Sequence, residues 1–179
     1  MRIDIKILIL FSAFIFLSCK GNVQVANAEK ATTEHTKPVI DKGIFPKPDG
    51  FVNDYAHVFT DSQKNELLEI VNDYNRKTTR QIVVITVDSI KPYDDIHKYA
   101  TDLGNTWGVG TAEKDNGLII VLCNPCRKIS IATGIGTEKI LTDEICKEVI
   151  DKTIIPEFKK GDFYKGIKNG ITELIKQWN

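Results

Sequence analysis

The sequence has no excess of either charge, because 24 lysine and arginine residues balance 24 aspartate and glutamate residues. Domains that bind nucleic acid usually carry a basic excess, so this balance argues against a general role in nucleic-acid binding. The part of the chain that is rich in apolar residues contains no internal repeat and no low-complexity segment. With 42% hydrophobic residues in 179, the chain has enough apolar side chains for one domain with a substantial core.

The first apolar run is too short to cross a membrane, which takes about 20 residues of helix. It covers residues 7–18, follows a short and mildly basic opening, and ends at Cys19. This arrangement is typical of a signal peptide, and Leu-Ser-Cys at its end resembles a bacterial lipoprotein signal, in which the cysteine is lipidated. An ordinary secretory signal with an incidental cysteine is the alternative.

We therefore expect a lipoprotein signal peptide at residues 1–18, and an envelope protein anchored to the membrane through a lipid on Cys19 and exposed outside the cytoplasm. Residues 19–48 are polar, with threonines and prolines and without an apolar period. They predict a flexible tether. The apolar anchors that begin at Phe51 predict that the globular domain covers residues 49–179.

Apolar periodicity within the domain predicts an α/β fold. A β-branched run at 81–87, a helical pattern that begins at Asp94 or Asp95, and an apolar run at 118–122 form a βαβ unit, so these two strands should be parallel. The runs at 118–122 and 129–132 should pair as an antiparallel hairpin. With further helices capped by Thr60, Thr142 and Asp162, the pattern predicts a three-layer α/β/α sandwich with a small mixed sheet flanked by helices.

The predicted hairpin gathers polar residues at one end of the sheet. Asp115 and Asn116 precede its first strand, and Glu138 follows its second, with Asp143 a few residues further on. Oxygen ligands beside a flexible backbone are what a hard divalent cation such as Ca²⁺ or Mg²⁺ requires. Two structural alternatives remain open. Asp115 and Asn116 are also typical turn residues, and Glu138 and Asp143 could stabilise the start of a helix through its dipole.

The ordered set of motifs resembles the TPM-domain family, over about residues 49–178. The matching segments include V-N-D-Y-A at 52–56, W-G-V-G at 107–110, K-D-N-G-L-I-I-V at 114–121 and I-A-T-G-I-G-T-E at 131–138. The resemblance implies a mixed sheet flanked by helices, a secreted or membrane-associated location, binding of Ca²⁺ or Mg²⁺ at acidic positions and, for some plant members, a proposed acid phosphatase activity. Asp54 is added to the predicted metal ligands on the basis of this resemblance alone. The chain departs from the family pattern at Thr137, where an apolar residue is usual.

Gly134 and Gly136 form a Gly-x-Gly turn before a helix, which could offer backbone N–H groups to a phosphate or could simply be a tight turn. We expect a membrane-tethered module of the cell envelope that binds a divalent cation and, through it, an envelope protein partner. The alternative is a metal-dependent acid phosphatase, in which a cation lowers the pKa of a bound water. No side chain stands out as its nucleophile or proton donor.

Cys123 and Cys126 form a C-x-x-C motif at the expected turn between two strands. In redox enzymes this motif usually opens a helix, which lowers the pKa of the thiol. A structural disulfide or two reduced thiols is therefore favoured over a thiol-redox protein, which is the third hypothesis. Cys146, in a helical pattern, is expected to be a small buried apolar residue.

Overall fold

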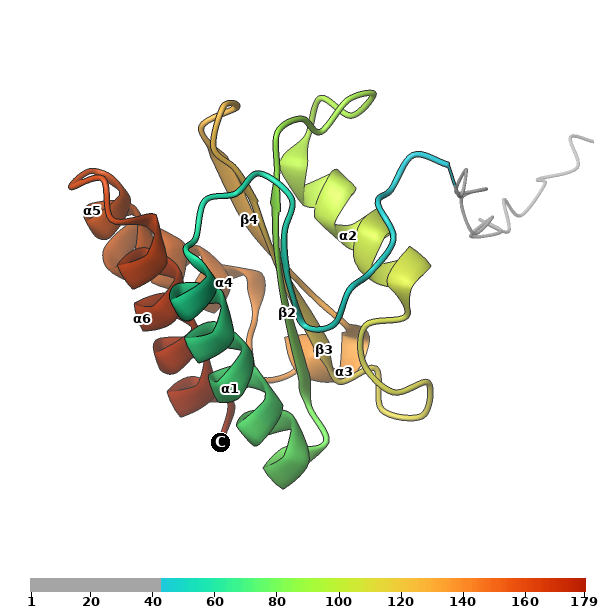
Figure 1. The fold of residues 1–179 in the computed structure, drawn as a ribbon. Helices are drawn as coiled ribbons and strands as arrows, with labels where there is room; N and C mark the ends of the chain where they lie inside the picture. Colours follow the sequence, from blue (N-terminus) through green and yellow to red (C-terminus); the bar gives the residue numbers. More distant parts are fainter. Residues whose placement is uncertain (1–42) are drawn as a thin grey trace, which may run out of the picture. The chain divides into compact units, whose positions relative to one another are not determined.

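The computed structural model describes residues 43–179, which form a four-stranded sheet with helices on both faces (Figure 1). The strands lie in the order β1 (Val52–Asp54), β2 (Gln81–Val87), β3 (Gly117–Cys123) and β4 (Lys128–Thr133). β2 is parallel to both β1 and β3, while β3 and β4 pair as an antiparallel hairpin. The predicted parallel pair and the predicted hairpin are confirmed, and β1 is an additional strand that the pattern did not predict.

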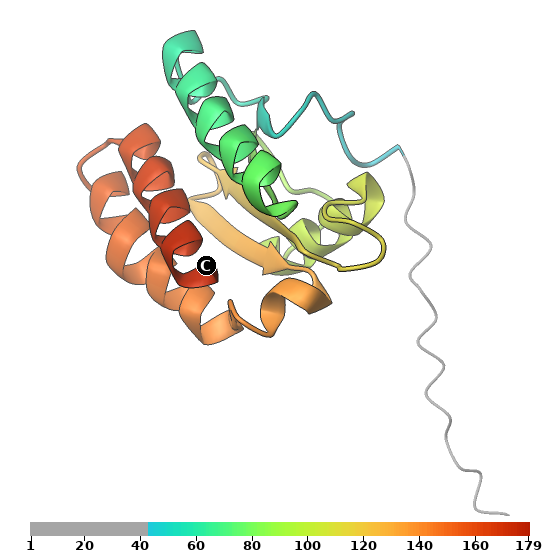
Figure 2. The same cartoon turned by 90° about the horizontal axis from the view of Figure 1, so that it is seen from below.

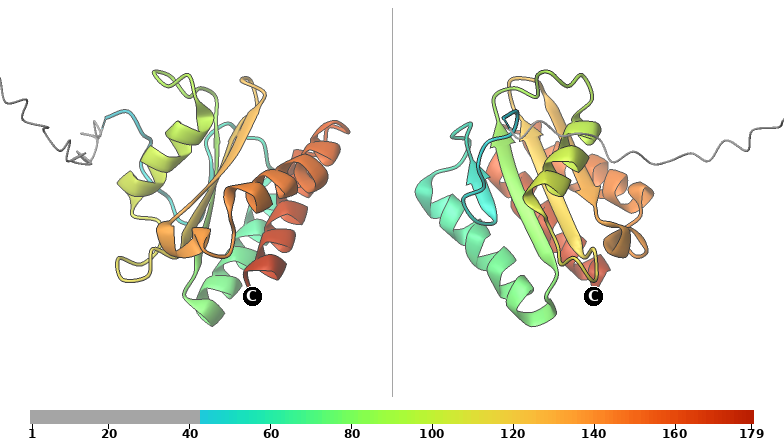
Figure 3. Two further views of the ribbon diagram at one scale, coloured as in Figure 1. Left: turned by 180° about the vertical axis from the view of Figure 1, so that it is seen from behind. Right: turned by 90° about the vertical axis from the view of Figure 1, so that its right-hand side faces the viewer.

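The helices divide between the two faces of the sheet, which confirms the predicted three-layer sandwich. One face is covered by α1 (Asp61–Thr78), α4 (Asp143–Val149) and α6 (Phe163–Trp178), and the other by α2 (Ile96–Trp107). Figures 2 and 3 show the same layers from other sides. The remaining helical segments are short: α3 (Ile135–Glu138), the π-helical turn η1 (Ile150–Ile154) and α5 (Ile155–Phe158).

The two central strands are mostly apolar because the sheet separates two cores. Ile82 and Val84 of β2 pack in the core shared with α1 and α6, whereas Val83 and Ile85 pack in the core shared with α2. β3 alternates in the same way. A strand that is buried on both faces favours apolar residues on both sides of the sheet, and this explains the nearly continuous β-branched run in the sequence.

The predicted helix starts are confirmed by their caps. Thr60 accepts a hydrogen bond from the Gln63 amide, and the Gln63 side chain accepts one from the Thr60 amide, which completes a capping box. Asp95, Thr142 and Asp162 cap α2, α4 and α6. In each case the side chain accepts a hydrogen bond from the backbone amide three residues further on. The helix that follows Thr142 widens into η1 directly before Pro156, because proline has no N–H to donate to the preceding turn.

The domain begins earlier than predicted. Phe45 is only 7% exposed, and its ring centroid lies 5.8 Å from that of Tyr93 and 5.2 Å from that of Tyr99. Trp107 Nε1 donates a hydrogen bond to the Pro46 carbonyl at 3.0 Å. The tether predicted for residues 19–48 therefore extends too far, because its last residues pack on the domain.

The predicted signal peptide at residues 1–18, Cys19 and the tether up to residue 42 lie outside the described residues. Within residues 43–179, every helix is too short or too polar to cross a membrane.

Candidate functional site

An open acidic pocket of about 440 Å³ lies where β3 begins and β4 ends. Asp115, Glu138 and Asp143 all line it, and all three residues are exposed. The antiparallel register explains why Asp115 and Glu138 lie at the same end of the sheet, because Leu118 near the start of β3 pairs with Thr133 at the end of β4. The structure thus brings together three of the five predicted metal ligands. We call this hollow the acidic pocket.

The loop that carries Asp115 lies directly against the backbone of the Gly-x-Gly segment. A Cβ atom on Gly136 would overlap the carbonyl oxygen of Lys114, and one on Gly134 would overlap that of Asp115. Asp115 itself has a φ of 44°, a left-handed conformation that aspartate tolerates better than most residues. The glycines are therefore required by close backbone packing, which fixes the position of Asp115 at the pocket.

The backbone amides of the two glycines are already used within the chain. Gly134 N–H donates to the Gly117 carbonyl at 2.9 Å, and Gly136 N–H donates to the Asp115 carbonyl at 3.1 Å. Neither group is free to bind a phosphate in this conformation, so the geometry supports the structural alternative for this segment. Thr137, the departure from the family pattern, is fully buried, and its hydroxyl donates to the Gly117 carbonyl at 2.9 Å.

Asn116 does not line the acidic pocket, although it is next to Asp115 in sequence. It is 8% exposed; its Oδ1 accepts from the Thr111 amide at 2.9 Å, and its Nδ2 donates to the Thr79 carbonyl at 3.1 Å. These bonds tie the loop before β3 to the C-terminus of α1. Asn116 therefore has a structural role here, which a turn residue often serves.

Asp54 lies at the opposite end of the sheet from Asp115. It pairs in register with Thr86 near the end of β2, whereas Gly117, which follows the Asp115 loop, pairs with Gln81 at the start of β2. Its carboxylate accepts from the amides of Val58 at 2.9 Å and Phe59 at 2.8 Å, and from the Thr86 hydroxyl. The prediction that Asp54 and Asp115 share one metal site is wrong for this geometry. β1, β2 and β3 are parallel, so the end of β1 and the start of β3 lie at opposite ends of the sheet.

α2 contributes a wall of the acidic pocket that the sequence reasoning missed. His97, Thr101 and Asn105 line it, and their spacing of four residues places them on one face of the helix. His97 Nδ1 lies 3.1 Å from the Ser130 hydroxyl oxygen of β4. The available signal was the spacing of four residues between these three polar side chains. Ile135 completes the rim and is 71% exposed.

The acidic pocket offers the right donor atoms for a divalent cation but not a closed cage. Carboxylates are the oxygen ligands that Ca²⁺ and Mg²⁺ prefer. Nowhere in residues 43–179 do three histidine, cysteine, aspartate or glutamate side chains lie close enough to hold one ion directly. The residues therefore fit a cation that keeps part of its water shell, and do not fit one that is coordinated by protein alone.

Cys123 and Cys126 form a disulfide at the far end of the β3–β4 hairpin, away from the acidic pocket. Cys123 is the last residue of β3, and no helix begins at the motif. The structural disulfide was one of the two favoured predictions. Cys146 is a free, buried thiol, as expected, and its pKa is raised to about 12 by burial and by the nearby charge of Asp143.

The fold and the acidic pocket define an α/β/α domain with an open acidic site at one end of its sheet. The TPM domain family matches residues 52–177, and the chain belongs to this family. The predicted resemblance is thereby confirmed.

Three NMR structures share the fold. The N-terminal domain of a protein from P. gingivalis is 25% identical with a TM-score of 0.65, over 71% of this chain and 80% of that chain. The N-terminal domain of a Corynebacterium glutamicum protein is 16% identical with a TM-score of 0.58, over 75% and 86%. The BA42 protein of Bizionia argentinensis is 18% identical with a TM-score of 0.59, over 67% and 81%. No curated protein matches the chain.

Proposed function

We propose that this TPM domain is a binding module of the cell envelope, tethered to the membrane through Cys19, whose contact surface depends on a divalent cation. The observation that carries the proposal is the acidic pocket, in which Asp115, Glu138 and Asp143 surround one hollow with Ile135 exposed at its rim. The cation is Ca²⁺ or Mg²⁺, and the partner is an envelope protein.

Electrostatics favour a bound cation in the acidic pocket. Three carboxylates line one hollow, so the hollow carries negative charge that attracts a divalent cation. Mg²⁺ usually keeps several waters and uses one or two carboxylates, and Ca²⁺ also accepts water in a flexible shell. An open pocket with space for water suits both ions. Asp54 and Asn116 are not part of this site, because their polar atoms are engaged elsewhere.

The rim of the acidic pocket supports a role in protein binding. Ile135, the first residue of the short helix α3 that also carries Glu138, is 71% exposed, and Ile140, which follows this helix, is 42% exposed. An apolar side chain beside charged groups is typical of a contact surface with a buried centre and a polar rim. The cation would set the net charge of this surface and, with it, the choice of partner.

A metal-dependent acid phosphatase is the second candidate function, and one observation favours it. His97 lines the same pocket as the three carboxylates, so a group able to donate a proton to a leaving alkoxide is present there. The cation would supply the polarisation of the phosphoryl group. The engaged amides of Gly134 and Gly136 argue against this candidate, because they offer no N–H groups to a phosphate.

Thermal unfolding of the purified protein in EDTA, Ca²⁺ or Mg²⁺ tests the proposal. A ligand that binds only the native state stabilises it by about 2.7 kcal/mol at a hundredfold excess over Kd. We expect either cation to raise the unfolding temperature, and Asp115→Asn, which tolerates the left-handed backbone, to abolish the rise. No rise at millimolar metal would refute cation binding. Hydrolysis of p-nitrophenyl phosphate that is lost in His97→Gln would instead favour the phosphatase.

A further inference from the structure

A second hollow, of about 650 Å³, lies at the other end of the β3–β4 hairpin, between the hairpin turn and α5 with the start of α6. Its apolar lining includes Ile129, Phe158 and Phe163. The two phenylalanine rings lie 4.9 Å apart between centroids, in a tilted arrangement. All three apolar residues are partly buried, so they form a recessed floor. We call this hollow the basic groove.

The charged residues that line the basic groove are all cations: Arg127, Lys128 and Lys159, and each is exposed. Among the ion pairs of residues 43–179, none involves Arg127 or Lys159. Lys128 Nζ donates to the backbone carbonyl of Asp94 at 2.7 Å. Glu157 is engaged by Lys160 and Lys165. The groove therefore presents cationic charge that its own lining does not neutralise.

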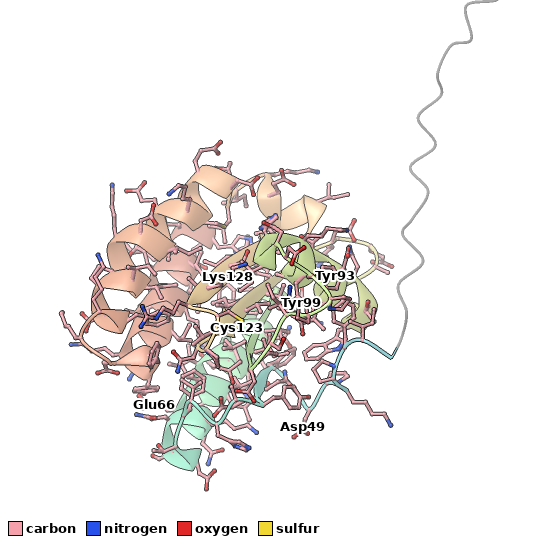
Figure 4. The ribbon with its side chains drawn as sticks, turned by 90° about the horizontal axis from the view of Figure 1, so that it is seen from above. Asp49, Glu66, Tyr93, Tyr99, Cys123 and Lys128 are labelled. Carbon is pink, nitrogen blue, oxygen red and sulfur yellow. A yellow bond between two sulfur atoms is a disulfide. The ribbon has the colours of Figure 1, made fainter. Side chains whose placement is uncertain are left out.

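Both walls of the basic groove are fixed by local structure. On one side, the Cys123–Cys126 disulfide closes the hairpin turn, and Arg127 N–H donates to the Asn124 carbonyl at 3.0 Å. Figure 4 shows Cys123 and Lys128 together at this end of the sheet. On the other side, a Cβ atom on Gly166 would lie 2.6 Å from the Phe158 ring, so this glycine lets the ring lie against α6.

We propose that the basic groove binds a single amphipathic anion, with its carboxylate or phosphate head at the cationic rim and its apolar body on the recessed floor. The volume falls within the usual range for small-molecule pockets, about 300–1,000 Å³. Charge complementarity selects an anion, and paired N–H groups of Arg127 suit a carboxylate or phosphate head. A bilayer surface fits less well, because it would need the apolar side chains to protrude. This proposal concerns a site separate from the acidic pocket.

Calorimetric titration of the purified full-length protein with decanoate, below its micelle concentration and in EDTA, tests the proposal. We expect decanoate to bind, and decanol, which has the same chain without the charge, to bind at least about tenfold more weakly. Lys159→Gln should raise the Kd for decanoate about three- to tenfold. Lys160→Gln is the matched control, because this neighbour pairs with Glu157 outside the groove and should leave the Kd unchanged.

Three results would overturn the proposal. Equal affinity for decanol and decanoate would mean that the cationic rim selects nothing. Equal effects of Lys159→Gln and Lys160→Gln would place the binding outside the basic groove. Binding to phosphatidylglycerol vesicles without binding to monomeric decanoate would identify a membrane contact instead. Because EDTA is present throughout, failure here is distinct from failure of cation binding in the acidic pocket.

Discussion

Asp54 is expected to stabilise the fold without taking part in cation binding. The change Asp54→Ala removes the acceptor for the Val58 and Phe59 amides and for the Thr86 hydroxyl. Hydrogen bonds to charged groups contribute about 1.5–3 kcal/mol each, and water replaces part of this in a half-buried site. We therefore expect a loss of roughly 3–4 kcal/mol in the free energy of unfolding, since three bonds disappear together.

Urea or thermal unfolding measures this loss directly. For a domain of this size, about 3 °C of unfolding temperature corresponds to each kcal/mol, so Asp54→Ala should lower it by about 10 °C. Asp54→Asn, which retains one acceptor oxygen, should lose less. Asp115→Asn is the matched control at the other end of the sheet and should change stability by less than about 0.5 kcal/mol in EDTA.

Two outcomes would contradict this reasoning about Asp54. A loss below about 1 kcal/mol would mean that its hydrogen bonds do not hold the segment that leads into α1. Alternatively, Asp54→Asn could fold normally and yet lose the rise in unfolding temperature that a cation produces. That result would make Asp54 a metal ligand after all.

Three further predictions concern other parts of the fold. Gly136→Ala should cost about 3 kcal/mol on urea unfolding, because the new Cβ overlaps the Lys114 carbonyl; a neutral effect would contradict the close packing. Reducing the Cys123–Cys126 disulfide should cost about 2 kcal/mol for so short a loop, and the protein should not reduce insulin; turnover of insulin would revive the redox hypothesis. Burial raises the pKa of Tyr99 to about 12. Since the unfolded state then loses its proton first, stability should fall as the pH rises from about 10 to 12, and Tyr99→Phe should reduce that fall in pH-dependent unfolding.

The elements with a clear apolar period were predictable from the sequence. The nearly continuous β-branched run at 81–87 predicts a buried strand, and the apolar spacing of three and four residues after Asp95 predicts an amphipathic helix; the structure has both. β1 was missed because it is only three residues long, which is too short to show a period. The position of Phe45 was missed for a different reason, because two adjacent apolar residues before a proline give no period.

The candidate site was predictable only where it depends on the hairpin. The hairpin register brings the segments of Asp115 and Glu138 to the same end of the sheet, and register follows from the apolar pattern. Asn116 depends on Thr79, which is 37 residues away in sequence. His97 enters the acidic pocket from α2, and the face of a helix that meets a given sheet edge is decided by packing of the whole domain.

The most direct test of cation binding in the acidic pocket is an NMR titration of the ¹⁵N-labelled protein with Ca²⁺ and with Mg²⁺. The backbone amide signals of Asp115, Glu138 and Asp143 should shift together and saturate, with the signal of Asp54 unchanged. Signals that shift mainly around Asp54, or no saturable shifts up to millimolar metal, would contradict the account.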